Sequence, residues 1–269
     1  MKTKEIQDFA KAIRRTAVQM AYNTRTSHTG GTMSQADVLA VLYSGVMEIS
    51  PETIDSPSRD RFIQSKGHCC ASYYAALALK GFMNYDELME QYCKDGSQYF
   101  EHVSHKLPGV ELSTGSLGHG LPVACGMALG AKRSGNNNKV YIIVGDGEIN
   151  EGSNWEAIMF AAHNKLDNLC VILDKNKMQA LGDTKDVLCL DPMPDKFKAF
   201  QWNVLDIDGH DIQQIVDAFD NFKHTIGKPT IIVANTIKGK GVSYMEHNLK
   251  FHYSAPNDEE YQIAMEELR

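Results

Sequence analysis

The stretch from residue 140 to residue 177 constrains the fold more than any other part of the sequence. It begins with a short, β-branched apolar run, 140–144, of the kind that forms a strand buried on both faces. The run ends abruptly in Gly145-Asp146-Gly147. We therefore expect a carboxylate just beyond the carboxyl end of a strand.

The same stretch continues as a helix and a second strand. The helical spacing places four apolar side chains on one face: Trp155, Ile158, Met159 and Ala162. A second apolar run, 169–173, leads into the polar residues 174–177. The pattern predicts a β-α-β unit, whose parallel strands end side by side at the edge where open α/β sheets bind ligands. Asp146 and Asn176 are therefore expected to meet in space.

These polar groups match the ligands of a hard cation. A carboxylate, an amide oxygen and a backbone carbonyl are too few to enclose Mg²⁺ but suffice when phosphate oxygens also bind it. Asp-Gly after an apolar run is more often a simple turn. The inference therefore depends on the whole pattern of Gly-Asp-Gly, a helix, a second strand and Asn176 at its end. An EF-hand is excluded because its sixth and twelfth positions would be Glu151 and Ala157, and no Rossmann or Walker glycine motif is present.

Composition narrows the class of protein. The chain has 269 residues, 43% of them apolar and 23% charged, which is ordinary for a globular protein, and no interdomain linker is visible. A net charge of −7 argues against a nucleic-acid surface, and no signal peptide or membrane span is recognisable. Six cysteines without CxxC spacing suggest reduced thiols. We expect one α/β domain, 1–269, in a cytoplasmic protein.

The remaining elements follow the same α/β alternation. Ser34 is expected to cap a helix that contains residues 38–42, after a polar, glycine-rich loop at 23–31. Lys238 to Gly241 is predicted to be a tight turn near the site. The other expected helices span 5–22, 69–79, 84–93, 121–130, 197–203, 212–224 and 258–269, and the other expected strands span 204–207 and 229–235.

Histidines are unusually frequent in the loops. Of the ten in the chain, His163 and His224 fall on predicted helices and are expected to be structural. His102 and His105 have a spacing that suits zinc, but no further ligand cluster accompanies them. The histidines expected in loops, near glycine or proline turns, are His28, His68, His102, His119 and His252.

The loops and the 140–177 unit together resemble the N-terminal part of transketolase, from about Ala10 to Pro256. The resemblance rests on seven segments that occur in the same order: SHTGG, DRFIQSKGH, HVSHKLPGVE, TGSLGHGL, GDGEINEG, DKN and FHYSAP. It implies a three-layer thiamine diphosphate-binding fold, in which a mostly parallel sheet is flanked by helices, and it implies thiamine diphosphate and Mg²⁺ as cofactors. Two differences are visible: many relatives have Gln in place of His119 and Pro in place of Thr29.

The resemblance also implies a role for individual residues. Mg²⁺ would be bound by Asp146, Asn176 and the carbonyl of Met178. Thiamine diphosphate would be contacted by Gly115, Ser116, Leu117, Gly147, His68 and His252. His28 and His252 are candidates for proton transfer, His102 would hold the two-carbon fragment, and Glu151 would connect paired active sites across a dimer. Histidine suits these tasks because it can give and take protons near neutral pH.

The activity implied is transfer of a two-carbon ketol unit from a ketose, or ketose phosphate, to an aldose. The family's pyrimidine-binding and C-terminal domains have no counterpart in the sequence, so the resemblance implies the N-terminal subunit of a split transketolase. Its expected partner carries the pyrimidine-binding domain, in an α2β2 assembly. The sequence does not identify the donor and acceptor sugars, the role of His119, or whether the chain alone retains cofactor.

Two alternatives remain at this point. The chain could serve another thiamine diphosphate reaction, such as that of 1-deoxyxylulose-5-phosphate synthase or a 2-oxoacid decarboxylase, which would consume pyruvate. It could also be a non-catalytic subunit that binds a partner. The set of polar residues, above all Asp146, Asn176 and the histidines, favours ketol transfer over both.

Overall fold

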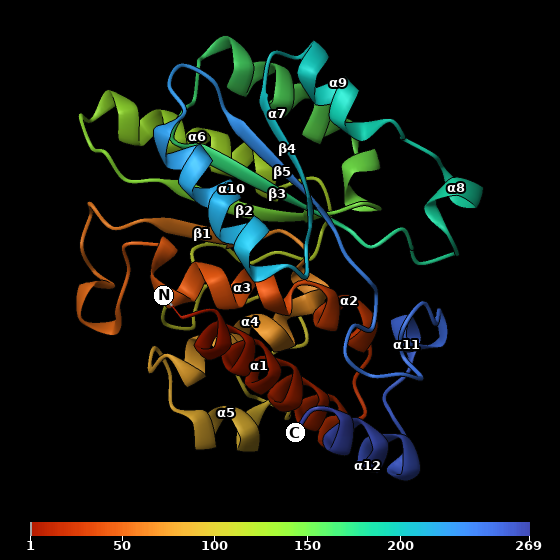
Figure 1. Ribbon diagram of the computed structural model, residues 1–269. Helices are drawn as coiled ribbons and strands as arrows, with labels where there is room; N and C mark the ends of the chain where they lie inside the picture. The colour runs from red at the N-terminus through yellow and green to blue at the C-terminus, as the bar shows by residue number, and fades with distance from the viewer. Residues whose placement is uncertain (1) are drawn as a thin grey trace.

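A five-stranded, fully parallel sheet forms the centre of the computed structural model, which describes residues 2–269 (Figure 1). The strand order is β1-β2-β3-β5-β4. The strands are β1 (Arg61–Gln64), β2 (Val140–Gly145), β3 (Leu169–Lys175), β4 (Asn203–Asp208) and β5 (Thr230–Asn235). The predicted 140–177 unit is confirmed, because β2 and β3 are parallel neighbours.

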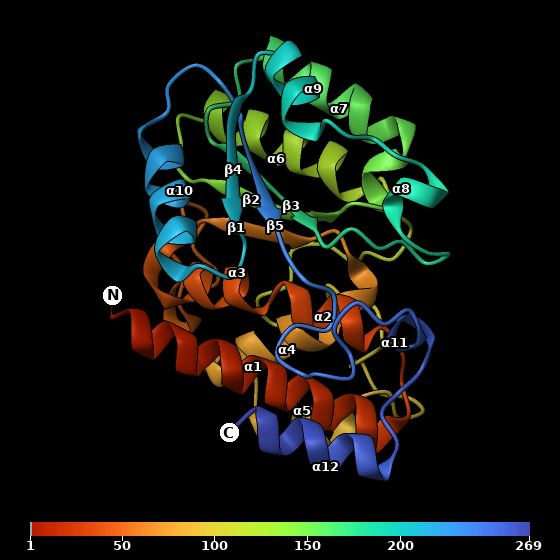
Figure 2. The ribbon, with the colours of Figure 1, turned by 45° about the vertical axis from the view of Figure 1, so that its right-hand side comes forward.

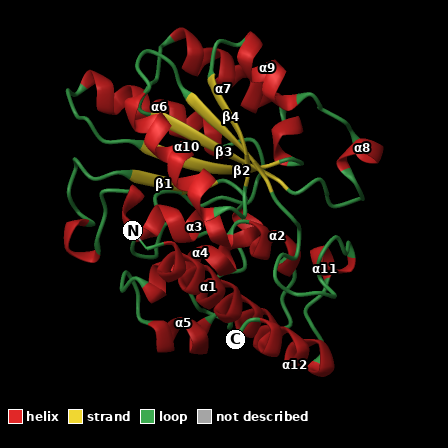
Figure 3. Cartoon of the chain, viewed as in Figure 1, coloured by secondary structure: helices red, strands yellow, loops and turns green. Residues whose placement is uncertain are grey.

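Helices cover both faces of the sheet, so the predicted three-layer α/β architecture is confirmed (Figures 1 and 3). One face is covered by α6 (Gly120–Arg133), α7 (Gly152–His163) and α9 (Met193–Ala199). On the other face lie α3 (Ala36–Val41), α4 (Cys70–Leu79) and α10 (Ile212–His224), with α1 (Thr3–Thr24) packed beneath them. The remaining helices are α2 (Thr29–Ser34), α5 (Tyr85–Gln91), α8 (Thr184–Val187), α11 (Lys250–Tyr253) and α12 (Asp258–Glu267). Figure 2 shows α12 lying along α1.

The central strands are apolar on both sides because both of their faces are covered. Along β2, Ile142 packs with α6 and α7, whereas Ile143 packs with the helices of the opposite face. On β3, Val171 and Ile172 divide between the two layers in the same way, and all four side chains are fully buried. Parallel sheets require this double burial, and it explains why these strands read as continuous apolar runs.

Shortening one central side chain tests how much this packing contributes. We expect Ile172→Ala to lower the free energy of unfolding by about 2–5 kcal/mol, because it removes buried methyl groups and leaves a cavity. Urea unfolding followed by circular dichroism measures the change. The matched control is Ile226→Ala, whose side chain is 88% exposed and whose loss is expected to change stability by about 0.5 kcal/mol at most. Equal effects of the two substitutions would contradict the assignment of the core.

Several sequence-based details are wrong. Ser34 does not cap a helix; it is the last residue of α2, and its hydroxyl donates to the Gly31 carbonyl and to Asp174. Helix α2 itself occupies part of the expected loop at 23–31, since burial of all six of its residues outweighs the low helix propensity of two glycines. Met159 points outward and is 51% exposed, while Asn154 takes a buried place on α7.

The segment between β3 and β4 also differs from the prediction. Helix α9 begins at Met193 and ends at Ala199, whereas a helix over 197–203 was predicted. Pro194 in its first turn and the burial of Phe197 fix its position. The short helix α8 lies between β3 and α9, where no helix was predicted. In residues 2–269, the structure contains no helix with both the length and the apolar character needed to cross a bilayer.

Candidate functional site

A cavity of about 330 Å³ opens at the carboxyl ends of the central strands. Asp146 follows β2 and Asn176 follows β3, and both side chains line the cavity. The register pairs Gly145 with Asp174, which places the two following loops side by side. The Lys177 amide donates to Asp146 Oδ2 over 2.6 Å, so the predicted meeting of these two loops is confirmed.

The three residues predicted to bind a cation, Asp146, Asn176 and Met178, all line this cavity. Asp146 is buried, and besides Lys177 it accepts from the Gly147 amide at 3.0 Å. Burial, with the nearby Asp174 carboxylate, raises the pKa of Asp146 to about 7. Asn176 Oδ1 accepts from the Met178 amide at 3.1 Å, and both residues are buried. No cluster of three or more His, Cys, Asp or Glu side chains suited to a metal occurs in residues 2–269, so a bound cation would need further oxygens from a ligand.

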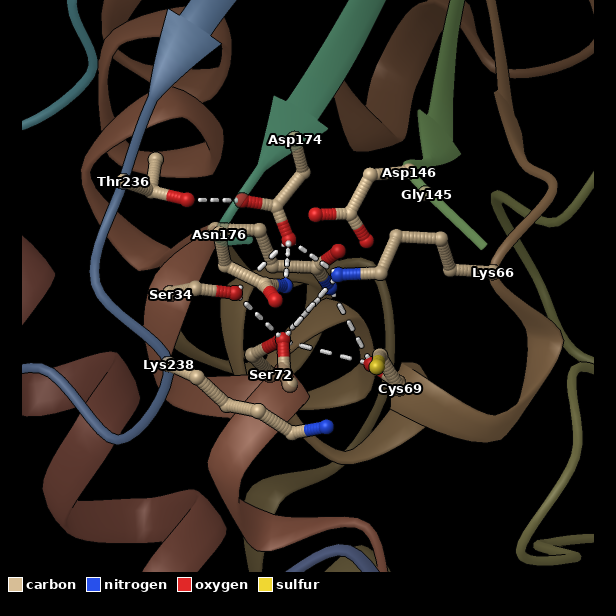
Figure 4. A network of polar contacts seen from close by, with 12 residues as sticks. Ser34, Lys66, Cys69, Ser72, Gly145, Asp146, Asp174, Asn176, Thr236 and Lys238 are labelled. Atoms are coloured by element: carbon tan, nitrogen blue, oxygen red, sulfur yellow. Dashed lines mark hydrogen bonds and ion pairs between the residues drawn. The ribbon is translucent and has the colours of Figure 1, made fainter. Parts of the chain in front are cut away.

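The buried carboxylate of Asp174 connects several residues next to the cavity. Asp174, 1% exposed, forms an ion pair with Lys66 and accepts from Ser34 Oγ at 2.7 Å and from the Thr236 hydroxyl (Figure 4). The Asn176 amide also donates to it, at 3.3 Å. Burial opposes ionisation of Asp174, yet Lys66 and the hydroxyl donors hold its pKa below the usual value. Asp174 thereby joins the strand ends to α2.

Two lysines supply positive charge to the cavity. Lys66 is 2% exposed and has its charge balanced by Asp174. Lys238 is also 2% exposed, and in residues 2–269 its side chain has no carboxylate partner; its Nζ lies 3.0 Å from His252 Nδ1. Burial lowers the pKa of Lys238. A buried cation with no protein counter-charge is costly unless an anion binds beside it, so the cavity fits an anionic ligand.

The predicted turn after β5 is what brings Lys238 to the cavity. Gly239 has a φ of 83°, and a Cβ there would lie 2.1 Å from the Met245 carbonyl oxygen, so only glycine fits. The Gly239 amide donates to the Gly30 carbonyl at 2.8 Å, which ties the turn to α2. The prediction of a tight turn is confirmed, but its lysine was not recognised as a site residue.

Four histidines gather at the mouth of the cavity. The ring centroid of His28 lies 5.1 Å from that of His68, 6.1 Å from that of His102 and 5.0 Å from that of His252. His28 immediately precedes α2, and its amide donates to the His252 carbonyl at 3.1 Å. His28 and His102 lie outside helices as predicted, but His68 and His252 lie in short helical turns. Segments from four parts of the sequence therefore form one ring of imidazoles.

Most of these rings are neutral at physiological pH. Burial, reinforced by Lys66, lowers the pKa of His68 to about 3. Burial and Lys238 lower that of His252 to about 3 as well, and burial with the nearby His28 lowers that of His102. A neutral imidazole both donates and accepts a hydrogen bond, so the ring of histidines can bind a hydroxyl-rich ligand and exchange protons with it.

The loop that contains Gly115 and Leu117, which line the cavity, is held in place by contacts with neighbouring segments. Glu111 forms ion pairs with Arg59 and with Arg61, whose Nη1 lies 3.0 Å away. Thr114 Oγ1 donates to the Gln64 carbonyl at 2.6 Å. Glu148 is 2% exposed and accepts from the amides of Gly118, at 3.1 Å, and Gly145, at 3.3 Å, as well as from Ser65. These contacts connect the loop to β1 and β2.

The structure brings most predicted site residues to the cavity and leaves two away from it. Ser116 and Glu151 are exposed and do not line it, and neither does His119, whose role the sequence left open. The sequence prediction missed Lys66, Lys238, Glu148 and Asp174; the only signal was their position at strand ends, within otherwise apolar or glycine-rich segments. The predicted residues that do line the cavity are His28, His68, His102, Gly115, Leu117, Asp146, Gly147, Asn176, Met178 and His252.

Together, the fold and the site define a class: an α/β protein with a polar cavity, lined by two lysines, at the carboxyl edge of a parallel sheet, the edge where open α/β sheets bind ligands. The family profile "Transketolase, thiamine diphosphate binding domain" matches residues 5–268. The chain belongs to this family.

Individual relatives agree with this assignment. The chain is 46% identical to an apulose-4-phosphate transketolase subunit of Actinobacillus succinogenes, over 98% of this chain and 96% of that protein. It is 41% identical to "6-deoxy-6-sulfo-D-fructose transketolase subunit SqwG" of Clostridium sp. (strain MSTE9), over 98% and 96% of the two chains. Transketolase from Campylobacter jejuni superposes with a TM-score of 0.94 at 30% identity, covering all of this chain and 43% of that one. The chain thus spans about two fifths of that solved transketolase.

Proposed function

We propose that the chain is the diphosphate-binding, N-terminal subunit of a two-chain transketolase, which transfers a two-carbon ketol unit between sugars. The observation that carries this proposal is that Asp146 and Asn176 line the same cavity as Lys238, a buried lysine whose side chain forms no ion pair among residues 2–269. Relatives that this chain matches nearly end to end are named as single subunits of transketolases. Both facts fit one half of a thiamine diphosphate site.

The cofactor would supply the carbanion that attacks the ketose carbonyl. Asp146, Asn176 and the Met178 carbonyl would hold Mg²⁺ against its diphosphate. Lys238, His68, Gly115, Leu117 and Gly147 would line the same binding region.

The remaining histidines would act on the sugar. His28 and His252 would exchange protons with its hydroxyl groups, and His102 would bind the two-carbon fragment. Ser116 and Glu151 are exposed, which suits contacts with a second chain. Glu151 would then act at an interface between copies.

We further propose that a second polypeptide carries the pyrimidine-binding domain and that residues 1–269 act as one domain. The two chains would form an α2β2 assembly, located in the cytoplasm. Relatives that this chain matches nearly end to end are named as subunits, which supports a partner chain. Four buried cysteines, Cys69, Cys70, Cys125 and Cys170, are free thiols, which suits a reducing compartment. The names of these relatives support a ketose, or ketose phosphate, as donor.

Native mass spectrometry of the tagged chain, purified from its own cells with Mg²⁺ and thiamine diphosphate, tests this proposal. We expect two copies of this chain, two of a second polypeptide and bound cofactor, and the purified assembly should transfer a ketol unit from a ketose to an aldose. Consumption of pyruvate instead would favour a different thiamine diphosphate reaction. An assembly that binds no cofactor would refute the proposed function.

A further inference from the structure

Beside His28 lies a carboxylate that does not line the cavity and has no assigned role. Glu101 Oε1 accepts from the Ser27 amide at 2.8 Å and from the Ser27 hydroxyl at 2.6 Å, and it lies 3.2 Å from His28 Nδ1. The side chains of Glu101 and His28 are 29% and 21% exposed. The hydrogen bond with His28 is the largest influence on Glu101, and with the two from Ser27 it lowers the pKa of that carboxyl to about 2. Glu101 is therefore an ionised acceptor of hydrogen bonds.

These contacts determine which nitrogen of His28 carries the proton. Ser27 Oγ has a single proton, which it donates to Glu101, and it also lies 2.8 Å from His28 Nδ1. The hydroxyl must therefore accept from the ring, so Nδ1 is protonated. The contacts of the ring with Ser27 and Glu101 both use Nδ1. In the neutral ring, Nε2 is left as an acceptor, and His28 is among the residues that line the cavity.

The cluster contains the residue types of a hydrolytic triad but not its arrangement. In such a triad the serine and the carboxylate bind opposite nitrogens of the imidazole, so that the ring can take the serine proton. Here Ser27 and Glu101 bind the same nitrogen. The serine already donates to the carboxylate and cannot be activated by the ring. The cluster orients the imidazole and does not form a nucleophile.

In His252 the proton lies on the other ring nitrogen, Nε2. Its Nδ1 lies 3.0 Å from Lys238 Nζ, and a protonated lysine can only donate. Nδ1 of His252 therefore accepts, and its Nε2 carries the proton. The two histidines, 5.0 Å apart between ring centroids, thus differ in which nitrogen is protonated.

The main chain also holds His28 in position. His28 has a φ of 61°, in the left-handed region that a residue with a side chain seldom adopts. Its amide donates to the His252 carbonyl and its carbonyl accepts from the Thr32 amide, both at 3.1 Å. Backbone conformations of this kind persist where surrounding contacts fix them, and they concentrate at functional sites. The imidazole is therefore held by its main chain and by its Nδ1.

We propose that Glu101, with Ser27, is the positioning residue that makes His28 Nε2 the proton acceptor of the ketol-transfer reaction, while Lys238 makes His252 a proton donor. The inference rests on the proposed function. As the donor C2–C3 bond breaks, the C3 hydroxyl gives its proton to His28 Nε2, and the bond's electron pair stays with the two-carbon fragment as the C3–O bond becomes a carbonyl. Glu101 stabilises the resulting imidazolium through Nδ1–H. The proton returns when the acceptor aldose is attacked.

The other titratable groups around His28 are neutral or cationic. The imidazoles of His68, His102 and His252 lie near its ring, and Lys66 and Lys238 line the same cavity. Glu101 is the carboxylate in contact with the His28 ring among residues 2–269. It is therefore the group that can offset a positive charge formed on that ring.

The experiment compares Glu101→Gln with the wild-type chain in two measurements. Long-range ¹H–¹⁵N spectra of the full chain with ¹⁵N-labelled histidine report which ring nitrogens are protonated, with His28→Asn identifying the signal. We expect His28 to be protonated at Nδ1 in the wild type and to populate the Nε2–H form in Glu101→Gln, because a Gln amide can donate to Nδ1. His252 should be protonated at Nε2 in both proteins.

The second measurement is steady-state ketol transfer by the assembled complex. Glu101→Gln should lower kcat roughly tenfold to hundredfold, less than the roughly 10²–10⁴-fold that a positioned base contributes because His28 itself remains, and it should leave the dissociation constant of thiamine diphosphate unchanged. Glu101→Asp should recover part of the loss. Glu90→Gln, on the exposed surface of α5, is the control and should behave as wild type in both measurements.

Each result decides the inference. An unchanged tautomer with unchanged kcat in Glu101→Gln would overturn it, and so would a changed tautomer with unchanged kcat. A loss of kcat that came with weaker cofactor binding and an unchanged tautomer would mean a merely structural role and would also overturn it. If the wild-type complex transfers no ketol unit, the proposed function fails; the spectra then still decide whether Glu101 sets the protonation of His28.

Discussion

Replacing Asp146 by alanine is expected to abolish Mg²⁺-dependent retention of thiamine diphosphate by the assembled protein. Asp146 contributes the single carboxylate of the proposed cation site, and the other two donors are neutral oxygens. Without it, the affinity should fall roughly 100-fold or more, since a hard dication depends on charged oxygen ligands and on their ordered surroundings. Isothermal titration calorimetry with cofactor, at several Mg²⁺ concentrations, measures the loss.

The loss should not come from unfolding. The Asp146 carboxylate is buried and repelled by that of Asp174, so the ligand-free protein does not depend on its charge. The urea midpoint of Asp146→Ala without cofactor should therefore lie near that of the wild type. Asp95→Ala, at an exposed position, is the control for binding. Mg²⁺-dependent retention by the Asp146 variant that matches the wild type would rule out the proposed cation site.

Asp174→Asn is expected to destabilise the chain by about 3–5 kcal/mol, because it leaves the Lys66 ammonium buried without a counter-charge. Both side chains of this pair are almost fully buried, at 3% and 1% exposure. The carboxylate also accepts hydrogen bonds from Ser34 and Thr236, which the amide of asparagine satisfies less well. Equilibrium urea unfolding of the full chain gives the free energy.

A double-mutant cycle separates the ion pair from the rest of the network. Lys66→Met alone should also destabilise, and the double variant Lys66→Met with Asp174→Asn should cost less than the sum of the two single changes. The exposed pair Lys198 and Asp195, 3.2 Å apart, provides the comparison, and Asp195→Asn should change stability by about 0.5 kcal/mol at most. Strict additivity of Lys66→Met and Asp174→Asn would contradict a coupled buried pair.

The part of the fold that could be predicted from sequence is the part governed by local periodicity. Apolar runs identified β2, β3 and β5, and the parallel arrangement of β2 and β3 then placed Asp146 near Asn176. The prediction failed where burial overrides local preference. Helix α2 contains two glycines and was predicted as loop, and the amphipathic face assigned to α7 wrongly included Met159.

The site was predictable where one residue carries a recognisable chemical type in a distinctive loop. His28 and His252 were found in this way. Asp174 and Lys66 were missed because each reads locally as the polar end of a strand, and only the parallel packing of β1, β2 and β3 shows that they form an ion pair. Glu101 was missed for a similar reason: its partners Ser27 and His28 lie more than 70 positions earlier in the chain.

The contact between α2 and α11 has a consequence for how the protein is made. The Thr29 hydroxyl reaches the Phe251 carbonyl, 222 residues further along the chain. Long-range closures of this kind form late in folding, because much of the chain must be ordered before they are favourable. A ribosome must therefore release most of the polypeptide before the ring of imidazoles can close. Cofactor should bind and stabilise finished molecules while partly folded ones stay empty, so its occupancy is a measure of completed biosynthesis.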